Sequence, residues 1–321
     1  MFSMITISIA SSVLAVVLMA SAAVPDTGCE PPREESSPGS RVDHLVIIGV
    51  DGLGPEGIRR AETPAIDALM DRGAWSMQAR AVMPTSSSPN WASMIMGAGP
   101  EQHGVTSNAW ELDAFAIAPT VAGPDGRFPT IFSVLRAQRP EAEIAVIYDW
   151  GGFGRLLNLD GTDLALDADG PEAATAAAEA ALVDRRPTLL FVHLDHVDHA
   201  LHDHGFLSEP YLDAVAEADR FIGRIVAALD RAGMTDRTAV LVTSDHGGQG
   251  TSHGGETMGE LLIPWILAGP GIETGRALAQ PINTYDTAAT AAALLGVEPP
   301  ECWIARPVTE SFVPEPATVG R

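Results

Sequence analysis

A segment rich in histidine and aspartate is the first candidate for chemistry. Residues 193–204 read HLDHVDHALHDH and hold five of the nine histidines of the chain. A second Asp/His set, Ser244-Asp245-His246, is followed by two glycines and then by His253-Gly254. Imidazole and carboxylate groups in mixed sets, with one position left open, suit a catalytic zinc ion. Alone, residues 193–204 are equally compatible with a surface tract that scavenges metal, but the second set favours a built centre.

A hydroxyl group for such a centre occurs in the segment MPTSSSPNWAS, residues 83–93. Ser88 can cap a helix that opens with Pro89, which puts Ser87 just ahead of a helix N-terminus. Free N–H groups and the helix dipole favour a phosphate or an alkoxide there. A turn with one capping serine explains the same residues equally well. Serine is a weak nucleophile until a base or a metal lowers its pKa, so Ser87 needs the Asp/His sets beside it.

Strands and helices alternate along the chain from about residue 41. Apolar β-rich runs predict strands at 42–50, 143–148, 188–194, 239–243 and 263–267. Helical spacing predicts helices at 64–72, with Thr63 as N-cap, and at 130–139, 173–183, 211–232 and 287–295. This order predicts an α/β fold with a mostly parallel sheet covered by helices on both faces. Asp51, Asp195 and Asp245 each follow a strand, so we expect them to converge at the carboxyl edge of the sheet.

Composition narrows the class of partner. The chain has 321 residues, 46% of them hydrophobic, which is enough for a sizeable core. Its formal net charge of −23 disfavours nucleic acid polymers and anionic bilayers. There is no lysine, which excludes a Schiff base or a Walker lysine. A small-molecule substrate is therefore expected, and no obligate protein partner is evident.

The N-terminal region predicts export. The first 25 residues carry no charged side chain, and Ala20-Ser21-Ala22 resembles a signal cleavage site, so residues 1–23 are predicted to be a signal peptide or an N-terminal anchor. Residues 24–41 read as a flexible linker. Residues 42–321 are predicted to form one metal-dependent hydrolase domain, with small insertions at 109–127 and 149–170. The expected location is periplasmic or extracellular. The sequence leaves open whether Cys29 and Cys302 pair.

Several ordered segments between about residues 42 and 308 resemble the alkaline phosphatase superfamily, and within it the nucleotide pyrophosphatase/phosphodiesterase branch. The matching segments are Gly49-Val-Asp51-Gly52, Pro84-Thr-Ser-Ser-Ser-Pro-Asn90, Pro100-Glu-Gln-His-Gly104 with the later Asn108, Asp195 with His199, Ser244-Asp-His-Gly247 and His253-Gly254. They are similar to that family's zinc-binding, nucleophile and phosphoryl-contacting motifs. Because the segments occur in the family's order, the resemblance does not depend on one pattern.

The resemblance implies an alkaline-phosphatase-like three-layer sandwich that hydrolyses phosphate esters with two zinc ions. By the same resemblance, Asp195, His199 and His253 would hold one zinc ion, and Asp51, Asp245 and His246 the other. Ser87 would be the nucleophile, would lie on the metal pair and would form a covalent phosphoseryl intermediate. Asn108, with backbone N–H groups after Ser87, would donate to the phosphoryl oxygens.

Some positions depart from the family pattern. Nucleotide hydrolases of the family usually have Phe after the nucleophile, where this chain has Ser88, so a nucleotide preference is not implied. Trp91 and Trp110 are alternative aromatic walls, although core positions are favoured for both. Asp198 is a second candidate ligand at the same spacing, placed below Asp195 because Asp195 ends a strand. Of the remaining histidines, His44 is expected to be structural, and His196 or His202 is a candidate for a supporting bond or a substrate contact.

The predicted substrate is a diester. No basic residue accompanies Ser87 in its motif to bind the extra charge of a monoester, and Arg155 is the one candidate for that role, with a solvated arginine as the commoner outcome. A phosphomonoesterase or a phosphotransferase is the alternative. A sulfatase is less favoured because Trp91 stands where that family has Arg, and a non-catalytic metal-binding protein is the remaining alternative.

Overall fold

The structure, a computed structural model, describes residue 29 and residues 40–314. The described strands are β1 His44–Val50, β2 Gly73–Arg80, β3 Ile144–Tyr148, β4 Leu164–Asp167, β5 Leu189–Leu194, β6 Thr238–Thr243, β7 Leu262–Ala268 and β8 Arg276–Ala277. The described α-helices are α1 Pro55–Arg60, α2 Pro64–Asp71, α3 Ser87–Met96, α4 Pro100–His103, α5 Ile131–Gln138, α6 Gly151–Gly154, α7 Pro171–Asp184, α8 His196–His204, α9 Glu209–Ala232, α10 Met258–Leu261 and α11 Asp286–Leu295.

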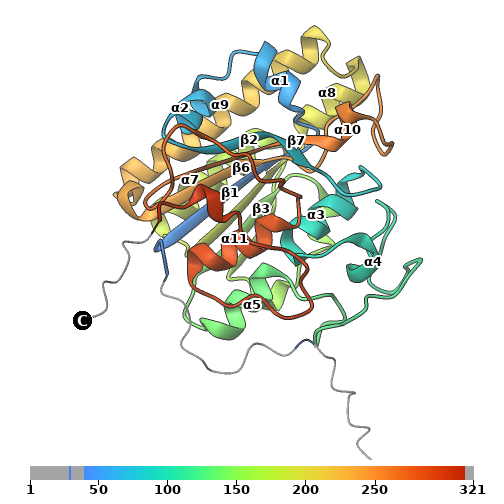
Figure 1. Cartoon of the computed structure of the whole chain (residues 1–321), viewed down its shortest axis with the longest axis vertical. Coiled ribbons are helices and arrows are strands. Elements are labelled where there is room, and N and C mark those ends of the chain that lie inside the picture. The colour runs from blue at the N-terminus through green and yellow to red at the C-terminus, as the bar shows by residue number, and fades with distance from the viewer. Residues whose placement is uncertain (1–28, 30–39, 315–321) are drawn as a thin grey trace, which may run out of the picture.

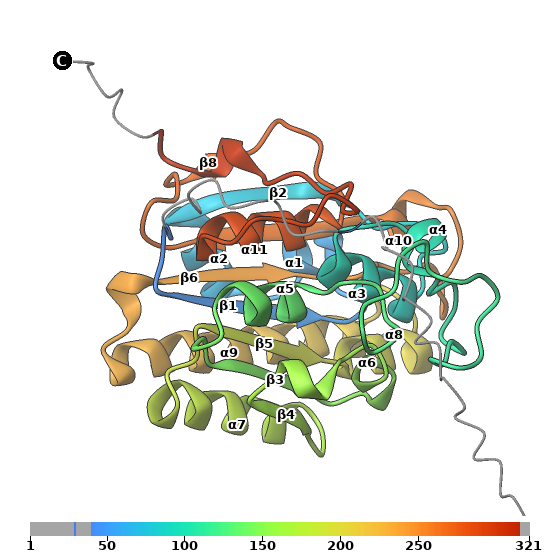
Figure 2. The same ribbon diagram turned by 90° about the horizontal axis from the view of Figure 1, so that it is seen from below.

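The described strands form one sheet in the order β4-β3-β5-β1-β6-β7-β2-β8. The five strands from β4 to β6 run parallel to one another. Only β7 departs from this direction, since it pairs antiparallel with both β6 and β2. Figure 2 shows β4 at one edge of the sheet and β2 with β8 at the other. The sheet is therefore mostly parallel, as the sequence predicts.

Helices cover both faces of the sheet (Figure 1). Alternate residues of β1 point to opposite sides: Leu45 and Ile47 belong to the core beneath α3, α5 and α11, whereas Val46 and Ile48 belong to the core beneath α2, α7 and α9. Apolar residues on both faces are typical of a parallel strand that is buried on each side. The result is the three-layer α/β sandwich expected from the resemblance.

The predicted strands and helices are all present, with ends that differ by at most two residues. The sequence pattern missed β2, whose residues GAWSMQAR include no β-branched side chain and which pairs along its length with β7. It also missed β4, which lies inside the predicted insertion 149–170 and extends the sheet beside β3. The other insertion, 109–127, contains turns and one isolated bridge between Glu111 and Ala114.

Cys29 and Cys302 form a disulfide bond. The pairing that the sequence left open is therefore present, and it joins residue 29 to the segment that follows α11. The predicted signal peptide or anchor, residues 1–23, lies outside the described residues. None of the helices in the described part of the chain combines the length and apolarity that a membrane span requires.

Candidate active site

Two strand ends bring together the first group of candidate ligands. Asp51 follows β1 and Asp245 follows β6, and these strands are paired in parallel. The Nε2 atom of His246 lies 3.3 Å from Oδ1 of Asp51 and 3.2 Å from Oδ2 of Asp245. All three side chains are buried, and their ligand atoms form a group that could hold a metal ion. The structure thus brings together Asp51, Asp245 and His246, the set that the family resemblance implies.

Helix α3 places Ser87 beside this group. The Ser87 Oγ lies 3.3 Å from Nε2 of His246. Trp91, one turn further along α3, donates its indole N–H to Oδ2 of Asp51 at 2.9 Å. This close packing requires Gly49 in β1, because a Cβ there would lie 2.5 Å from the Trp91 ring. The helix begins at Ser87 with Ser86 as N-cap, so the prediction of a Ser88 cap before Pro89 is wrong by two residues.

Helix α8 and a glycine-rich loop supply a second group: Asp198, His202 and His253. The Nε2 atoms of His202 and His253 lie 3.1 Å apart. Oδ2 of Asp198 lies 3.2 Å from Nε2 of His202, and Oδ1 lies 3.7 Å from Nε2 of His253. The loop can approach α10 because residue 247 is glycine: a Cβ there would lie 2.1 Å from the carbonyl oxygen of Gly259. Figures 1 and 2 both show α3, α8 and α10 at the same end of the sheet.

The structure does not assemble the predicted set of Asp195, His199 and His253. The imidazole of His199 is 70% exposed and contacts Asp195 at 2.8 Å, on the outside of α8. Among the described residues, Asp195 shares a potential ligand group with Asp51 and His193, whereas His253 shares one with Asp198 and His246. The Asp-x-x-x-His pair that faces His253 is therefore Asp198 and His202, three residues further along the chain.

The way α8 packs on the core explains this difference. Val197 and Leu201 are four residues apart and fully buried, so they mark the inner side of the helix. Asp198 and His202 each follow one of these residues and lie at the edge of the buried side. His199 lies a further residue round the helix and faces solvent. Placing Asp195 at a strand end was correct, but it did not determine where the histidine four residues later would point.

Backbone carbonyl oxygens fix the orientation of the three imidazoles. Nδ1 of His246 lies 2.8 Å from the oxygen of Gly247, Nδ1 of His253 lies 2.9 Å from that of Thr85, and Nδ1 of His202 lies 3.0 Å from that of Thr251. A carbonyl oxygen only accepts, so each Nδ1 carries the proton. In the neutral rings each Nε2 then presents a lone pair. The 3.1 Å contact between His202 and His253 thus brings two lone pairs together beside a carboxylate.

Burial and mutual repulsion perturb the carboxylates of the site. Burial, reinforced by the charge of Asp51, raises the pKa of Asp195 to about 8 and that of Asp198 to about 6. The same two causes raise the pKa of Asp245 well above its usual range. Burial alone would lower the pKa of His246, but Asp245 and Asp51 outweigh it and raise the pKa to about 10. The pocket therefore favours a cation, and a divalent ion could replace the proton on His246.

His193 is a buried residue of the site that the sequence analysis left without a role. It lies between two carboxylates, with Nε2 3.4 Å from Oδ2 of Asp51 and Nδ1 3.3 Å from Oδ1 of Asp149. The same Asp149 oxygen accepts the backbone N–H of Asp195 at 2.8 Å. The signal for His193 was its place among the apolar residues 189–194 of a predicted strand, since a polar side chain there must find buried partners.

Asn108 reaches the nucleophile segment from another direction. Its side-chain Oδ1 accepts the backbone N–H of Ser88 at 2.8 Å. That N–H is thereby occupied, which corrects the expectation that it would be free to contact a phosphoryl oxygen. His103, in the preceding motif, is buried and packs α4 on α3 through a 3.0 Å contact between its Nε2 and the Ser93 hydroxyl.

Three further residues considered in the sequence analysis, Trp91, Trp110 and His44, pack within the fold. Trp91 and Trp110 are both buried, which favours the core assignment over an aromatic wall. His44 contacts the carbonyl oxygen of Pro187 at 2.8 Å.

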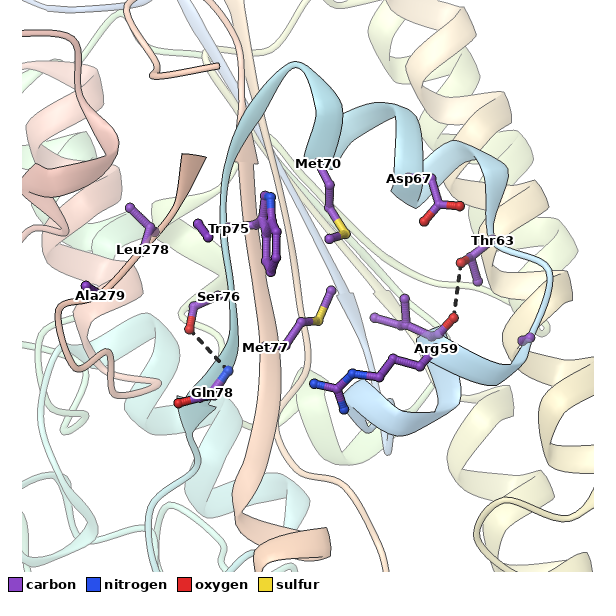
Figure 3. A pocket seen from close by; sticks show the side chains of 13 residues that line it. Arg59, Thr63, Asp67, Met70, Trp75, Ser76, Met77, Gln78, Leu278 and Ala279 are labelled. Carbon is purple, nitrogen blue, oxygen red and sulfur yellow. Dashed lines mark hydrogen bonds between the residues drawn. The ribbon is translucent and has the colours of Figure 1, made fainter. Parts of the chain in front are cut away.

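A cavity of about 590 Å³ lies between α1, α2, β2 and the β8 region (Figure 3). It is lined by residues such as Met70 and Trp75 and by none of the candidate ligands.

The fold, together with a match to a family model, places the chain in the alkaline phosphatase superfamily. The family model for type I phosphodiesterase / nucleotide pyrophosphatase matches residues 45–116 and 144–265. The chain belongs to this family. The matched residues include Asp51, Ser87, Asn108 and both Asp-x-x-x-His pairs, Asp195 with His199 and Asp198 with His202.

Similar proteins include both phosphate and sulfate ester hydrolases. Mouse steryl-sulfatase is 37% identical over 153 residues, which are 39% of this chain and 24% of that protein. The chain therefore spans about a quarter of the length of this relative. Among solved structures, an inactive variant of murine ectonucleotide pyrophosphatase/phosphodiesterase 5 in complex with AMP gives a TM-score of 0.67 at 14% identity, covering 80% of this chain and 96% of the other. A mutant of the alkaline phosphatase PafA gives 0.72 at 12% identity, covering 86% and 100%.

Proposed function

We propose that the chain hydrolyses small-molecule phosphate diesters through a covalent phosphoseryl intermediate on Ser87, with two zinc ions as cofactors. One ion would be held by Asp51, Asp245 and His246. The other would be held by Asp198, His202 and His253, a set that replaces Asp195 and His199 of the sequence-based expectation. Mixed nitrogen and oxygen ligands suit zinc in catalytic sites.

The single observation that carries the proposal is the contact between the Nε2 atoms of His202 and His253. Both rings use their Nδ1 protons on backbone carbonyl oxygens. Two unprotonated Nε2 atoms 3.1 Å apart, with a carboxylate oxygen of Asp198 3.2 Å from that of His202, direct their lone pairs to a common point where a metal ion or a shared proton would be stabilised. The Ser87 hydroxyl lies 3.3 Å from the third imidazole, His246, so a nucleophile is adjacent to the ligand atoms.

When bound, divalent zinc would supply positive charge and a lowered hydroxyl pKa. In the proposed reaction, the Ser87 oxygen forms a bond to phosphorus while the bond to the leaving alcohol breaks, and the alcohol departs with a proton. Water then cleaves the phosphoseryl ester, which releases a phosphomonoester and restores the serine. Ser87 is the first residue of α3, where the helix dipole favours the developing negative charge. The Oδ1 atom of Asn108 accepts the backbone N–H of Ser88, and this fixes the orientation of the amide. The Nδ2 donors of Asn108 would then be the groups that contact a phosphoryl oxygen.

A diester is favoured over a monoester by the state of Arg155. Its guanidinium donates to Oε1 of Glu111 at 2.6 Å and to the carbonyl oxygen of Asn108 at 2.9 Å. A guanidinium with these partners already has its positive charge paired with a carboxylate. The second negative charge of a monoester would then lack a cation of its own.

A sulfate ester is the second candidate substrate, because the similar proteins include sulfatases. Ser87 and Pro89 fit the beginning of a sulfatase motif. Trp91, which stands at the position of that motif's arginine, is fully buried and bonded to Asp51. Trp91 therefore has its only side-chain N–H already in use and carries no positive charge to offer a sulfate group, so phosphate remains the first choice.

The test of the nucleophile compares S87A with S93A. Ser93 lies in the same helix and also contacts a buried imidazole, that of His103 at 3.0 Å, so S93A controls for the loss of a serine–histidine contact. With zinc present, we expect S87A to lose activity toward bis-p-nitrophenyl phosphate by at least about 1000-fold. S87A should keep its metal content, measured by atomic emission, and S93A should keep its activity. An S87A enzyme with wild-type turnover would refute the assignment.

The substrate class is tested by comparing three p-nitrophenyl compounds: the phosphate diester, the phosphate monoester and the sulfate. We expect the diester to give the highest kcat/KM, and activity to disappear with chelator and return with zinc. A preference for the monoester or the sulfate by orders of magnitude would contradict the proposal. No turnover of any of the three would favour a non-catalytic metal-binding protein.

We also propose that the protein is exported. The uncharged N-terminal segment supports this location, and so does the Cys29–Cys302 disulfide, because such bonds persist mainly in oxidising compartments. Fractionation of cells that express the full chain, with antibody detection, tests the location. Recovery in the cytoplasm with both thiols free would contradict it.

A further inference from the structure

Arg155 connects the two insertions of the chain at the edge of the candidate site. It follows α6, within the insertion 149–170, and its side chain reaches the other insertion. One guanidinium nitrogen donates to Oε1 of Glu111 at 2.6 Å, and another donates to the backbone carbonyl oxygen of Asn108 at 2.9 Å. The side chain of Arg155 is 32% exposed, so this is neither a buried pair nor a freely solvated arginine.

The backbone of Arg155 is itself fixed. Arg127 donates from Nε and from one terminal nitrogen to the carbonyl oxygen of Arg155, at 3.3 and 3.1 Å. Arg127 is only 16% exposed and pairs with Asp125 at 3.5 Å. A continuous set of hydrogen bonds therefore runs from Arg127 to Arg155, to the backbone of Asn108, and from the Asn108 side chain to the backbone of Ser88.

The Asn108 backbone depends on such polar contacts, because residues 107–109 are exposed. The Asn108 amide must hold a defined orientation to use its Nδ2 donors, since a donor displaced by a fraction of an ångström loses much of its effect on a transition state. The side chain of Arg155, which lies outside the nucleophile segment, holds the Asn108 backbone by a hydrogen bond to its carbonyl oxygen.

We propose that Arg155 is a positioning residue that holds Asn108 in register with Ser87, and that Glu111 in turn holds Arg155. The proposal rests on the proposed role of Asn108 as a donor to the phosphoryl group. It assigns Arg155 no contact with substrate, which separates it from the expectation that this arginine neutralises a phosphate charge.

The experiment compares R155Q, E111Q, N108A and the double variant N108A/R155Q on bis-p-nitrophenyl phosphate. R185Q is the matched control: Arg185 also joins a glutamate, Glu143 at 2.6 Å, to a backbone carbonyl oxygen, that of Asp163 at 3.2 Å. We expect R155Q to lower kcat by about tenfold, the equivalent of one charge-assisted hydrogen bond, with little change in KM. Orthovanadate inhibition should weaken by a similar factor, and the melting temperature should stay near wild type because an exposed ion pair contributes little stability. R185Q should match wild type in all three measurements.

The sign of the E111Q effect separates positioning from direct contact. If Glu111 holds Arg155 in place, E111Q lowers kcat as R155Q does. If Arg155 contacts substrate, removing the acidic partner raises activity, and that result overturns the proposal. The double variant should be no slower than N108A alone, because both changes remove the same interaction.

The outcomes also separate this proposal from the proposed function. An N108A enzyme as fast as wild type removes the role of Asn108 and the positioning proposal with it. A slow N108A enzyme, with an R155Q effect that adds fully in the double variant, leaves the role of Asn108 intact and overturns the positioning role of Arg155.

Discussion

Asp51, Asp245 and His246, here called the strand group, follow the ends of two paired strands, whereas Asp198, His202 and His253, the helix group, come from a helix and a loop. The strand group is completely buried, while His202 in the helix group is 44% exposed. Neighbouring parallel strands end at the same edge of a sheet, so their following residues meet wherever the strands pair. A helix and a loop have no such constraint, and their ligands meet only when the helix phase and the loop path both allow it.

The largest effect is expected in the strand group, from D245N. Asp245 accepts the backbone N–H of Gly52 at 3.2 Å, and Asn preserves this acceptor while removing the charge. We expect at least about a 1000-fold loss in kcat/KM, because metal sites supply several kcal/mol of transition-state stabilisation. Metal content should fall by one ion per chain. Retention of both ions and of activity would show that the strand group is not a metal site.

The next effect tests the helix group by comparing H202Q with H199Q. H202Q should lower activity and zinc affinity by more than about 100-fold, the upper range for loss of a supporting partner. H199Q should stay within about twofold of wild type, as for most exposed substitutions. Zinc titration with a competing chelator measures both variants. The reverse order would restore Asp195 and His199 as ligands and would show that α8 turns in the metal-bound protein.

A smaller effect is expected at Trp91, which supports the strand group. W91F keeps most of the ring but removes the 2.9 Å bond to Asp51, and we expect about a 10- to 100-fold loss of activity. W265F is the matched control, because Trp265 is equally buried and donates to Thr287 at 3.2 Å. If W265F reduces kcat as much as W91F, the effect of W91F reflects core packing alone.

The smallest effect is expected at Thr85, which supports the helix group. Its hydroxyl donates to the carbonyl oxygen of Gly255 at 2.7 Å and accepts the N–H of Gly254 at 3.1 Å. T85V should lower activity by about tenfold through displacement of His253. T290V is the matched control, since Thr290 of α11, a helix that supplies none of the candidate ligands, donates to the carbonyl oxygen of Asp286 and accepts the N–H of Val308. Equal kinetic losses in T85V and T290V would argue against a specific role for the loop anchor.

The difference between the strand group and the helix group also explains how much of the site the sequence could predict. Apolar runs such as 189–192 identified the inner strands, and Asp51 and Asp245 could be placed together because each follows such a run within two residues. Strand β2 was not predicted because it is stabilised by pairing with β7 rather than by the strand propensity of its own residues. Asp198 and His202 share their spacing with Asp195 and His199, so spacing alone could not choose between the pairs. The choice depends on which side of α8 packs on the core.

Other features required contacts that sequence patterns do not carry. The sequence around Arg155 does not indicate that its partner is Glu111, 44 residues earlier. The two side chains come into contact because of how two irregular insertions fold. His193 needed Asp149 and Asp51 from two other strand ends. Fold and strand-end ligands are thus set by local pattern, while orientation within the site is set by tertiary packing.

The covalent link between Cys29 and Cys302 has a consequence for proteolysis. A single cut at any peptide bond between these two residues divides the polypeptide in two but leaves the pieces attached through sulfur. A nicked molecule would therefore migrate as one band in a non-reducing gel and separate into fragments only when a thiol is added.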